Sequence, residues 1–233
     1  MIKLNSKEVK IWFISDTHYG HANIVSGVSR WSDKDISCRQ FNTVEEMSQH
    51  LVGQINKYVG EDDILFHLGD WSFGGIENIW NFRKQIKCKN IHLILGNHDK
   101  HILLGKKLLN CYCNNDGEVE NGKFTTYGDW RDDLFNAYPL NLFESIQKHL
   151  EVIIDGTLVI MNHYPLLDFH MNEYKEVIDL FGHVHGKIPH QIVEKSGFRI
   201  DVGVDNAFKL FGEYKPFSWE EIIKLKNENN SNI

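Results

Sequence analysis

Several features that would place this chain outside the ordinary globular proteins are missing from its sequence. No run approaches the roughly 18 consecutive apolar residues of a membrane span, and the segment 1–10 lacks the apolar centre of a signal peptide. We therefore expect a cytoplasmic protein with no membrane partner. Only 4 of the 233 residues are proline and 18 are glycine, which excludes collagen-like and low-complexity chains.

An excess of basic residues is also missing. Lys and Arg number 25 against 32 Asp and Glu, so the formal net charge is −7. A chain without a global positive field does not hold long nucleic acid non-specifically, and we expect no stable binding of that kind. The four cysteines, Cys38, Cys88, Cys111 and Cys113, contain no C-x-x-C pair, so we expect free thiols. A C-x-C metal site at Cys111 and Cys113 stays open as the weaker interpretation.

The first half of the chain contains three short apolar segments separated by helical patterns. The segments 9–14, 64–68 and 91–95 are rich in β-branched and aromatic residues, which predicts buried strands. Apolar residues recur at steps of three and four over 44–59, and more weakly over 76–86, which predicts helices between the strands. This half is therefore predicted to be βαβαβ.

The second half is predicted to be mainly β. Residues 152–161 indicate a hairpin around an Asp-Gly turn, and 177–181 and 198–204 indicate further strands, the last ending near Asp205. Ser218 and Glu221 have the spacing of a capping box, which predicts a terminal helix that begins there and ends at Leu225.

We expect these elements to form one α/β domain over residues 1–225, with two β-sheets packed together and helices outside. Residues 226–233 are polar, and we expect them to be a flexible tail. The sequence shows no internal repeat and no Gly-, Pro- or Ser-rich linker that would divide it into two domains.

Polar residues collect where the predicted strands end. Because ligands bind at the carboxyl ends of strands in open α/β sheets, we expect these side chains to converge. A set of imidazoles and carboxylates without cysteine suits Mn, Fe, Zn or Ni better than Mg or Ca, and this set is large enough for two ions that share a carboxylate. The candidates are Asp16, His18, Asp70, Asn97, His98, His163, His183 and His185.

Two of the candidate pairs, Asp16 with His18 and His183 with His185, are two residues apart. In an extended segment, residues two apart point to the same side of the backbone. We therefore expect these segments to be extended, so that each presents both of its side chains to the site.

These motifs resemble, in order, the five motifs of the calcineurin-like metallophosphoesterases, over residues 9 to about 205. The chain also resembles a subgroup of small bacterial and phage predicted phosphoesterases, through residues 15–21, residues 39–41 ahead of the predicted helix that contains 45–47, and residues 67–70. The resemblance implies the sandwich of that family, two mixed β-sheets flanked by helices, and a metal-dependent phosphoesterase. The motifs are Asp16-x-His18, Gly69-Asp70, Gly96-Asn97-His98-Asp99, His163 and Gly182-His183-x-His185.

The family pattern implies two divalent transition metals, with Mn²⁺ expected first and Fe, Zn or Ni as alternatives. It implies that Asp70 bridges the two ions. The remaining ligands divide into a first group, Asp16, His18 and His185, and a second group, Asn97, His163 and His183.

Catalytic roles follow from the same resemblance. A metal-bridging hydroxide is implied as the attacking group, with His98 as the general acid that protonates the leaving alkoxide. We expect Asp99 to orient the His98 ring and to favour its charged form.

The substrate is a phosphate ester, and the motifs narrow its class. The arginine-containing signature of the Ser/Thr phosphatases is missing after Asp70, and the G-N-H-D form of the third motif resembles the phosphodiesterase and nuclease branches. We therefore expect a phosphodiesterase acting on small or nucleotide-like substrates. The alternatives are a nuclease on short or single-stranded ends, a phosphomonoesterase, and a non-catalytic metal-binding scaffold of the kind that lacks the catalytic histidine.

Four further residues near the motifs have two interpretations each. Arg39 has a planar fork that could grip a phosphate, although an arginine before a helix is usually solvated. His21 lies beside the first motif, where it could contact substrate or support a ligand. Trp71 and Phe73 could stack on a base, although aromatic residues are more often part of the core.

Overall fold

The computed structural model describes residues 1–32, 38–102, 142–174, 176–188, 191–192 and 197–230. Cys38 and Cys88 are free thiols, whereas Cys111 and Cys113 lie outside the described residues. None of the described helices is both long and apolar enough to cross a membrane.

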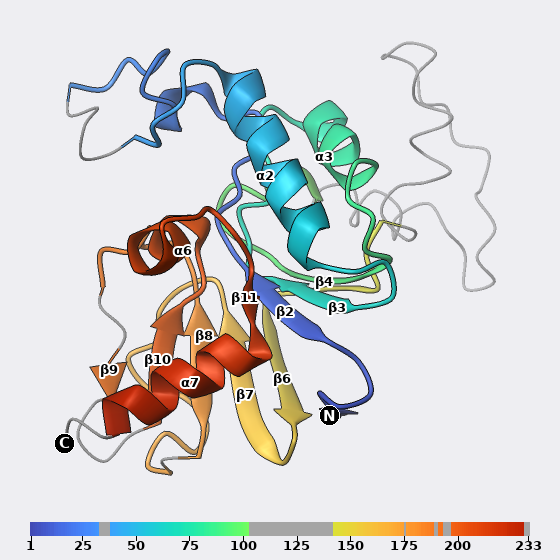
Figure 1. Ribbon diagram of the computed structural model, residues 1–233, viewed down its shortest axis with the longest axis vertical. Helices are drawn as coiled ribbons and strands as arrows, with labels where there is room; N and C mark the ends of the chain where they lie inside the picture. The colour runs from blue at the N-terminus through green and yellow to red at the C-terminus, as the bar shows by residue number, and fades with distance from the viewer. Residues whose placement is uncertain (33–37, 103–141, 175, 189–190, 193–196, 231–233) are drawn as a thin grey trace.

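Two mixed β-sheets form the centre of the fold (Figure 1). Within the described residues, the first sheet has the strand order β11-β2-β3-β4-β5, in which β2 to β5 run parallel and β11 antiparallel. Its strands are β2 (Ile11–Ile14), β3 (Ile64–His67), β4 (Asn90–Ile94), β5 (Ser145–Gln147) and β11 (Phe217–Ser218).

The second sheet has the order β1-β6-β7-β8-β10-β9, with β6 and β7 joined as an antiparallel hairpin and β7, β8 and β10 parallel. Its strands are β1 (Ile2–Leu4), β6 (His149–Ile154), β7 (Thr157–Asn162), β8 (Ile178–Phe181), β9 (Gln191–Ile192) and β10 (Phe198–Asp201). The predicted two-sheet α/β fold is therefore confirmed.

Alternation of side chains along the first sheet produces two cores. Phe13 of β2 and Phe66 of β3 face the second sheet and stack with ring centroids 5.5 Å apart, in a cluster that includes Leu180 of β8. Ile14 and Leu65 point to the opposite face. A strand buried on both faces is what a continuous apolar run predicts.

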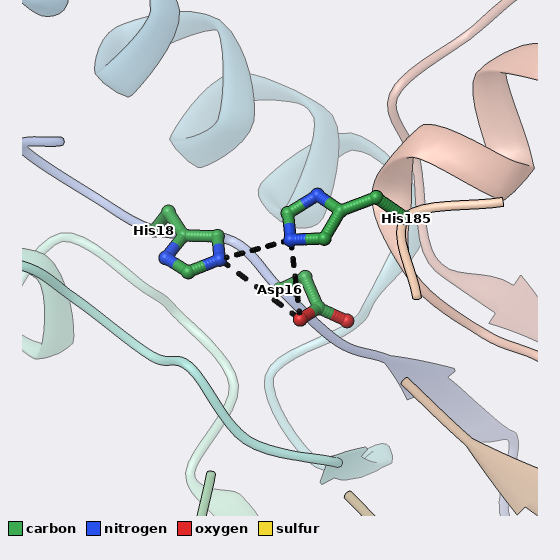
Figure 2. A group of neighbouring side chains, drawn as sticks. All are labelled: Asp16, His18 and His185. Carbon is green, nitrogen blue, oxygen red and sulfur yellow. Dashed lines mark hydrogen bonds and ion pairs between the residues drawn. The ribbon is translucent and has the colours of Figure 1, made fainter. Parts of the chain in front are cut away.

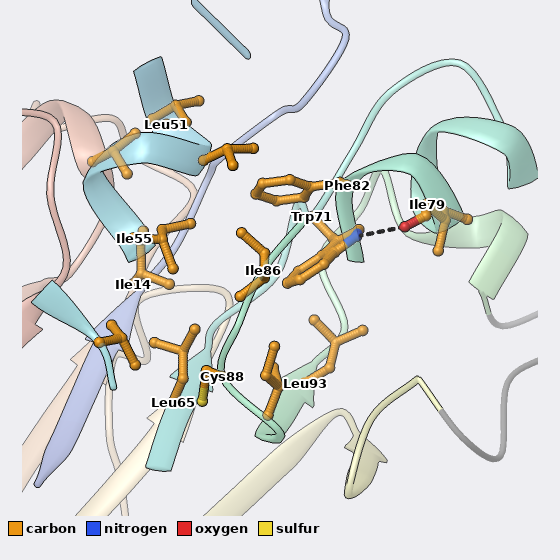
Figure 3. Packing of buried hydrophobic residues seen from close by; sticks show 14 of the residues in the cluster. Ile14, Leu51, Ile55, Leu65, Trp71, Ile79, Phe82, Ile86, Cys88 and Leu93 are labelled. Atoms are coloured by element: carbon orange, nitrogen blue, oxygen red, sulfur yellow. Dashed lines mark hydrogen bonds between the residues drawn. The ribbon is translucent and has the colours of Figure 1, made fainter. Parts of the chain in front are cut away.

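Helices α2 (Val44–Tyr58) and α3 (Ile76–Arg83) cover that opposite face of the first sheet. Figure 3 shows Leu51 of α2 and Phe82 of α3 in the same buried cluster as Trp71. The Trp71 indole is fully buried, and its Nε1 donates a hydrogen bond to the Ile79 carbonyl at 3.3 Å. Trp71 is therefore a core residue, and the interpretation of it as a base-stacking residue is wrong.

The terminal helix α7 (Trp219–Asn230) begins at the predicted capping box. Ser218 Oγ accepts the Glu221 N–H at 3.1 Å, and the Glu221 carboxylate accepts the Ser218 N–H at 2.9 Å. The helix continues beyond Leu225, because Lys226 is largely buried and pairs with Glu176 at 3.5 Å. The expected end at Leu225 is therefore wrong, and residues 231–233 lie outside the described part of the chain.

The strand predicted over 198–204 is also too long. β10 ends at Asp201, whose carboxylate accepts the Gly203 N–H at 2.7 Å and turns the chain away from the sheet. A helix that the sequence pattern did not indicate, α6 (Val204–Phe211), begins directly afterwards. This turn carries Asp205 back towards the loops that follow β2 and β8.

Candidate metal centre

The loops that follow β2, β3, β4, β7 and β8 meet at one edge of the sandwich. Backbone hydrogen bonds join them in pairs, from Asp16 N to Gly69 O and from Gly182 N to His163 O, both at 2.9 Å. The His183 N–H donates to Asp16 Oδ2 at 2.9 Å, which links a loop of the first sheet to a loop of the second. The predicted convergence of strand ends is therefore present.

One cluster consists of Asp16, His18 and His185 (Figure 2). His18 Nε2 and His185 Nε2 lie 3.9 and 3.8 Å from Asp16 Oδ1, and 3.3 Å from each other. Carboxylate oxygens and imidazole nitrogens are both able to donate a lone pair to a metal ion. These three side chains can therefore hold one ion.

A second cluster lies around Asn97. Its Oδ1 is 3.0 Å from His163 Nε2 and 3.0 Å from His183 Nδ1. Asp70 lies between the clusters, with Oδ2 at 3.5 Å from His18 Nε2 of the first and at 3.5 Å from His163 Nε2 of the second. One carboxylate oxygen thus faces both candidate ion positions.

The ligand loops are not extended, contrary to our expectation. Five candidate ligands have left-handed backbone conformations: Asp16 (φ 56°), His18 (φ 48°), Asp70 (φ 56°), His183 (φ 69°) and His185 (φ 51°). Such conformations are sparsely populated for residues other than glycine, and each costs on the order of 1–3 kcal/mol. The paired side chains meet because each loop coils, not because it continues the pleat of the strand. Backbone strain of this kind clusters at functional sites.

The glycines that precede Asp70 and Asn97 are required for a steric reason. Gly69 has φ +99°, and a Cβ at that position would lie 2.6 Å from both Gly96 N and His163 Nδ1. A Cβ on Gly96 would overlap Asp70 Oδ1. The glycines of these two motifs therefore allow the loops after β3 and β4 to approach each other closely.

Hydrogen bonds orient two imidazoles towards the clusters. His163 Nδ1 is 2.8 Å from the Leu68 carbonyl, and His185 Nδ1 is 2.7 Å from Asp205 Oδ2. Both partners are acceptors, so Nδ1 carries the proton in each ring and the Nε2 lone pair faces the cluster. In this tautomer, Nε2 of each ring is available to bind a metal ion.

Asp16 supplies a further sign that the site fits a cation. Its side chain is fully buried, and Oδ1 has no hydrogen-bond partner among the described residues. Burial raises the pKa of this carboxyl to about 6, a net result in which His185 opposes the rise and the neighbouring Asp70 carboxylate supports it. A buried anionic oxygen without a donor is costly, and a bound divalent ion would remove that cost.

Arg39 is not available to grip a phosphate, so that expectation is wrong. The side chain is 2% exposed, and Nε and Nη2 bind the two oxygens of Asp205 at 2.8 Å each. The remaining N–H groups face the Asp16 carbonyl at 2.5 Å, the Thr17 carbonyl at 2.9 Å and Met47 Sδ at 3.8 Å. All five donors of the guanidinium are therefore used inside the protein.

His98 lies next to the first cluster, with its ring centroid 5.3 Å from that of His18. Its backbone N–H donates to Asp70 Oδ1 at 2.8 Å. Asp99, expected to orient the His98 ring, uses its carboxylate differently. Its oxygens accept the backbone N–H groups of Asp70 (2.8 Å), Gly96 (2.8 Å) and Trp71 (3.0 Å). Asp99 thus fixes the loop that carries Asp70.

His21 is largely buried under an aromatic side chain. Its ring stacks on Phe73 with centroids 4.0 Å apart, and it lies 5.3 Å from the His18 ring. Burial, together with the neighbouring His98 and Arg39, lowers the pKa of His21 to about 4. A neutral, covered imidazole is suited to packing next to His18 and is a poor cationic grip for a phosphate.

Two supporting carboxylates were not identified from the sequence. Asp205 joins Arg39 to His185, and although burial opposes it, this carboxylate raises the pKa of His185. Asp201 accepts the N–H groups of Gly186 and Gly203, both at 2.7 Å. The signal that could have revealed both is their position, because Asp201 is the last residue of the parallel strand β10 and Asp205 comes shortly after it.

Comparisons with known proteins agree with these motifs. A family model described as calcineurin-like phosphoesterase matches residues 9–187. An uncharacterized protein of Methanocaldococcus jannaschii is 26% identical over 218 residues, which cover 93% of this chain and 90% of that protein. The Gene 66 protein of Mycobacterium phage D29 is 25% identical over 215 residues, covering 84% of this chain and 87% of the phage protein.

Among solved structures, the chain is similar to the crystal structure of a protein of unknown function from Aquifex aeolicus. The TM-score is 0.50 at 19% identity, and the match covers 93% of this chain and 99% of the other. A likeness at this identity concerns the fold alone.

We predict that the Arg39 and Asp205 pair stabilises the loops of the centre. Arg39→Met should lower the free energy of unfolding by about 3–5 kcal/mol, because it leaves the largely buried Asp205 carboxylate without the guanidinium that pairs with both of its oxygens. The double variant Arg39→Met, Asp205→Leu should be less destabilised than Arg39→Met alone. Urea unfolding followed by circular dichroism measures both. Equal stability of Arg39→Met and the unaltered protein would rule out this role for the pair.

Proposed function

The chain belongs to the calcineurin-like phosphoesterase family, and we propose that this metal-dependent phosphoesterase is a dinuclear phosphodiesterase acting on small or nucleotide-like esters. One observation supports the dinuclear assignment above the others. Asp70 Oδ2 lies 3.5 Å from an imidazole nitrogen of each cluster, so a single carboxylate oxygen is shared between two groups of candidate ligands.

The ligands divide between the ions according to the two clusters. Asp16, His18 and His185 would hold the first ion, and Asn97, His163 and His183 the second, with Asp70 bridging both. The mixture of imidazole nitrogens with carboxylate and amide oxygens suits Mn²⁺, Fe, Zn or Ni, and we expect Mn²⁺ first. When bound, such a pair of ions lowers the pKa of water from 15.7 towards about 7 and offsets the charge that develops on the phosphoryl oxygens.

His98 is the proposed general acid. Its ring lies beside His18 at the edge of the first cluster, and the hydrogen bond from its N–H to Asp70 Oδ1 fixes the backbone at this position. A protonated imidazole there would donate its proton to the leaving oxygen. Asp99 contributes by positioning the Asp70 loop, since both of its oxygens accept backbone N–H groups.

The space beside the second cluster supports a small substrate. A cavity of about 330 Å³ lies between the loops after β4 and β7, and its lining includes Asn97, His163, Lys100 and Lys148. This volume is at the lower end of the range for small-molecule sites, which is about 300–1,000 Å³. Both lysines are exposed, and among the described residues neither is paired with a carboxylate, so they add positive charge for an anionic ester.

The first prediction from this proposal concerns turnover. The protein loaded with Mn²⁺ should hydrolyse bis(p-nitrophenyl) phosphate, and EDTA should abolish the reaction by removing the ions. Release of p-nitrophenol measures the rate, and metal analysis of the same sample measures the ions bound. A monoester, a cyclic nucleotide and a single-stranded oligonucleotide, assayed in parallel, separate the phosphodiesterase from a phosphomonoesterase and a nuclease. Metal-loaded protein that turns over none of them would be a scaffold.

A second prediction isolates the proton donor. His98→Ala should lower kcat for this diester by about 10²- to 10⁴-fold, because the leaving oxygen would depart without a positioned acid. The variant should keep its full metal content, since His98 is not among the proposed ligands. Unchanged kcat would remove His98 from the reaction.

A third prediction tests the bridge. Asp70→Asn should reduce the bound metal from about two ions per chain to one or none, and kcat should fall with it, because an amide is a neutral and weaker ligand than a carboxylate. Metal analysis by mass spectrometry gives the stoichiometry, with His98→Ala as the matched control for a variant at the same loops. Two ions retained in Asp70→Asn would contradict the shared position of this carboxylate.

A further inference from the structure

Two large aromatic side chains stand exposed near the first cluster, one beside His98, the proposed acid, and one beside His21. Phe73 is 40% exposed and Trp31 is 41% exposed. Phe73 follows β3 by a few residues and lies in the same loop as Asp70, so it belongs to the rim of the metal centre. Neither ring is used by the ligand set or by the proton transfer proposed above.

These rings form a continuous series with the site. The Phe73 ring lies 5.5 Å from the His98 ring, and the His98 ring lies 5.3 Å from the His18 ring. Phe73 also stacks on His21, whose ring lies 6.1 Å from that of His98 and meets Trp31 edge-on at 6.5 Å and 88°. The exposed aromatic surface is therefore next to the proton donor and one ring further from the proposed ions.

The position of Phe73 is fixed rather than adaptable. Its N–H donates to the Tyr19 carbonyl at 2.8 Å, and its own carbonyl accepts from Asn78 Nδ2 at 2.6 Å. One face of the ring is covered by His21 in a near-parallel stack, with 16° between the planes. A ring held in this way needs no reordering when a ligand binds to its exposed surface.

We propose that Phe73, with Trp31 beside it, binds a planar aromatic ring carried by the leaving group of the ester, as a nucleobase is carried by a nucleoside. The proposal rests on the proposed function, because His98 defines the side on which the leaving group departs. A leaving group that receives its proton from His98 extends from the ions towards Phe73. A planar π-system gains more on this ring than an aliphatic group of equal size, because offset stacking adds to the burial of apolar area.

The size of the effect follows from base stacking in single-stranded nucleic acid sites. Loss of one stacking aromatic there weakens binding by about 5- to 150-fold and depends little on the identity of the base. We expect the same range for Phe73 and little discrimination among bases.

The test compares two sugar phosphates, of which one carries a nucleobase and the other does not. Calorimetric titration of the Mn²⁺-loaded protein gives Kd for adenosine 5′-monophosphate and for ribose 5-phosphate. The nucleotide should bind more tightly. Phe73→Ala should raise the Kd of the nucleotide by about 5- to 150-fold and leave the Kd of ribose 5-phosphate unchanged. Phe73→Trp should retain the preference for the nucleotide.

Phe208→Ala is the matched control. Phe208 is exposed to a similar degree and also stacks on an aromatic ring, that of Tyr214, but it lies on α6 outside the ring series of the site. The Phe208→Ala substitution should leave both Kd values unchanged.

Two results would overturn the proposal. One is equal affinity of the unaltered protein for the two phosphates. The other is an equal loss of affinity for both in Phe73→Ala, which would assign Phe73 to the structure of the phosphate site. Both results come from binding measurements and do not require turnover. If the protein hydrolyses no phosphate ester but still prefers the nucleotide, the proposed function is contradicted and the binding site for the aromatic ring is not.

Discussion

The hydrogen bond from the His183 N–H to Asp16 Oδ2 joins the two sheets at the edge where the candidate ligands meet. Asp16 follows β2 of the first sheet and His183 follows β8 of the second, so neither sheet alone can assemble the site. Because Oδ2 is committed to this bond, the other oxygen, Oδ1, is the one that faces His18 and His185. A bond between the sheets thus also decides which oxygen faces the first proposed ion position.

Around this link, buried polar groups are matched by other buried groups. The Arg39 guanidinium binds the carbonyls of Asp16 and Thr17 and pairs with Asp205, which in turn holds His185. The Asp99 carboxylate likewise holds the Asp70 loop in place by accepting three backbone N–H groups. Left-handed backbone at five candidate ligands costs free energy, and these side chain to backbone bonds offset it.

The sequence reveals the parts of this arrangement that depend on local pattern. Apolar runs that end in polar clusters predict both the strands and the edge at which Asp16, Asp70 and Asn97 meet, because parallel strands share a carboxyl edge. The pattern fails where a long-range partner decides the outcome. Nothing in the local sequence shows that Arg39 pairs with Asp205, 166 residues away. Nor does it show that the Asp99 carboxylate binds backbone amides and not the His98 ring. Alternation through residues 198–204 likewise conceals the turn at Asp201, which only its bonds to Gly186 and Gly203 explain.

The two sides of the centre differ chemically, and this difference would orient a diester. On the side of the first cluster lie His98, the proposed proton donor, and the exposed surface of the Phe73 ring. On the side of the second cluster, the cavity lined by Lys100 and Lys148 offers space and positive charge, and among the described residues its lining includes the ring of Tyr164. A diester whose leaving group carries a ring therefore gains most with that group towards His98, and its retained ester group then lies towards the lysines. The same orientation places the leaving oxygen next to the acid, so recognition of the ring and protonation of the leaving group favour one pose.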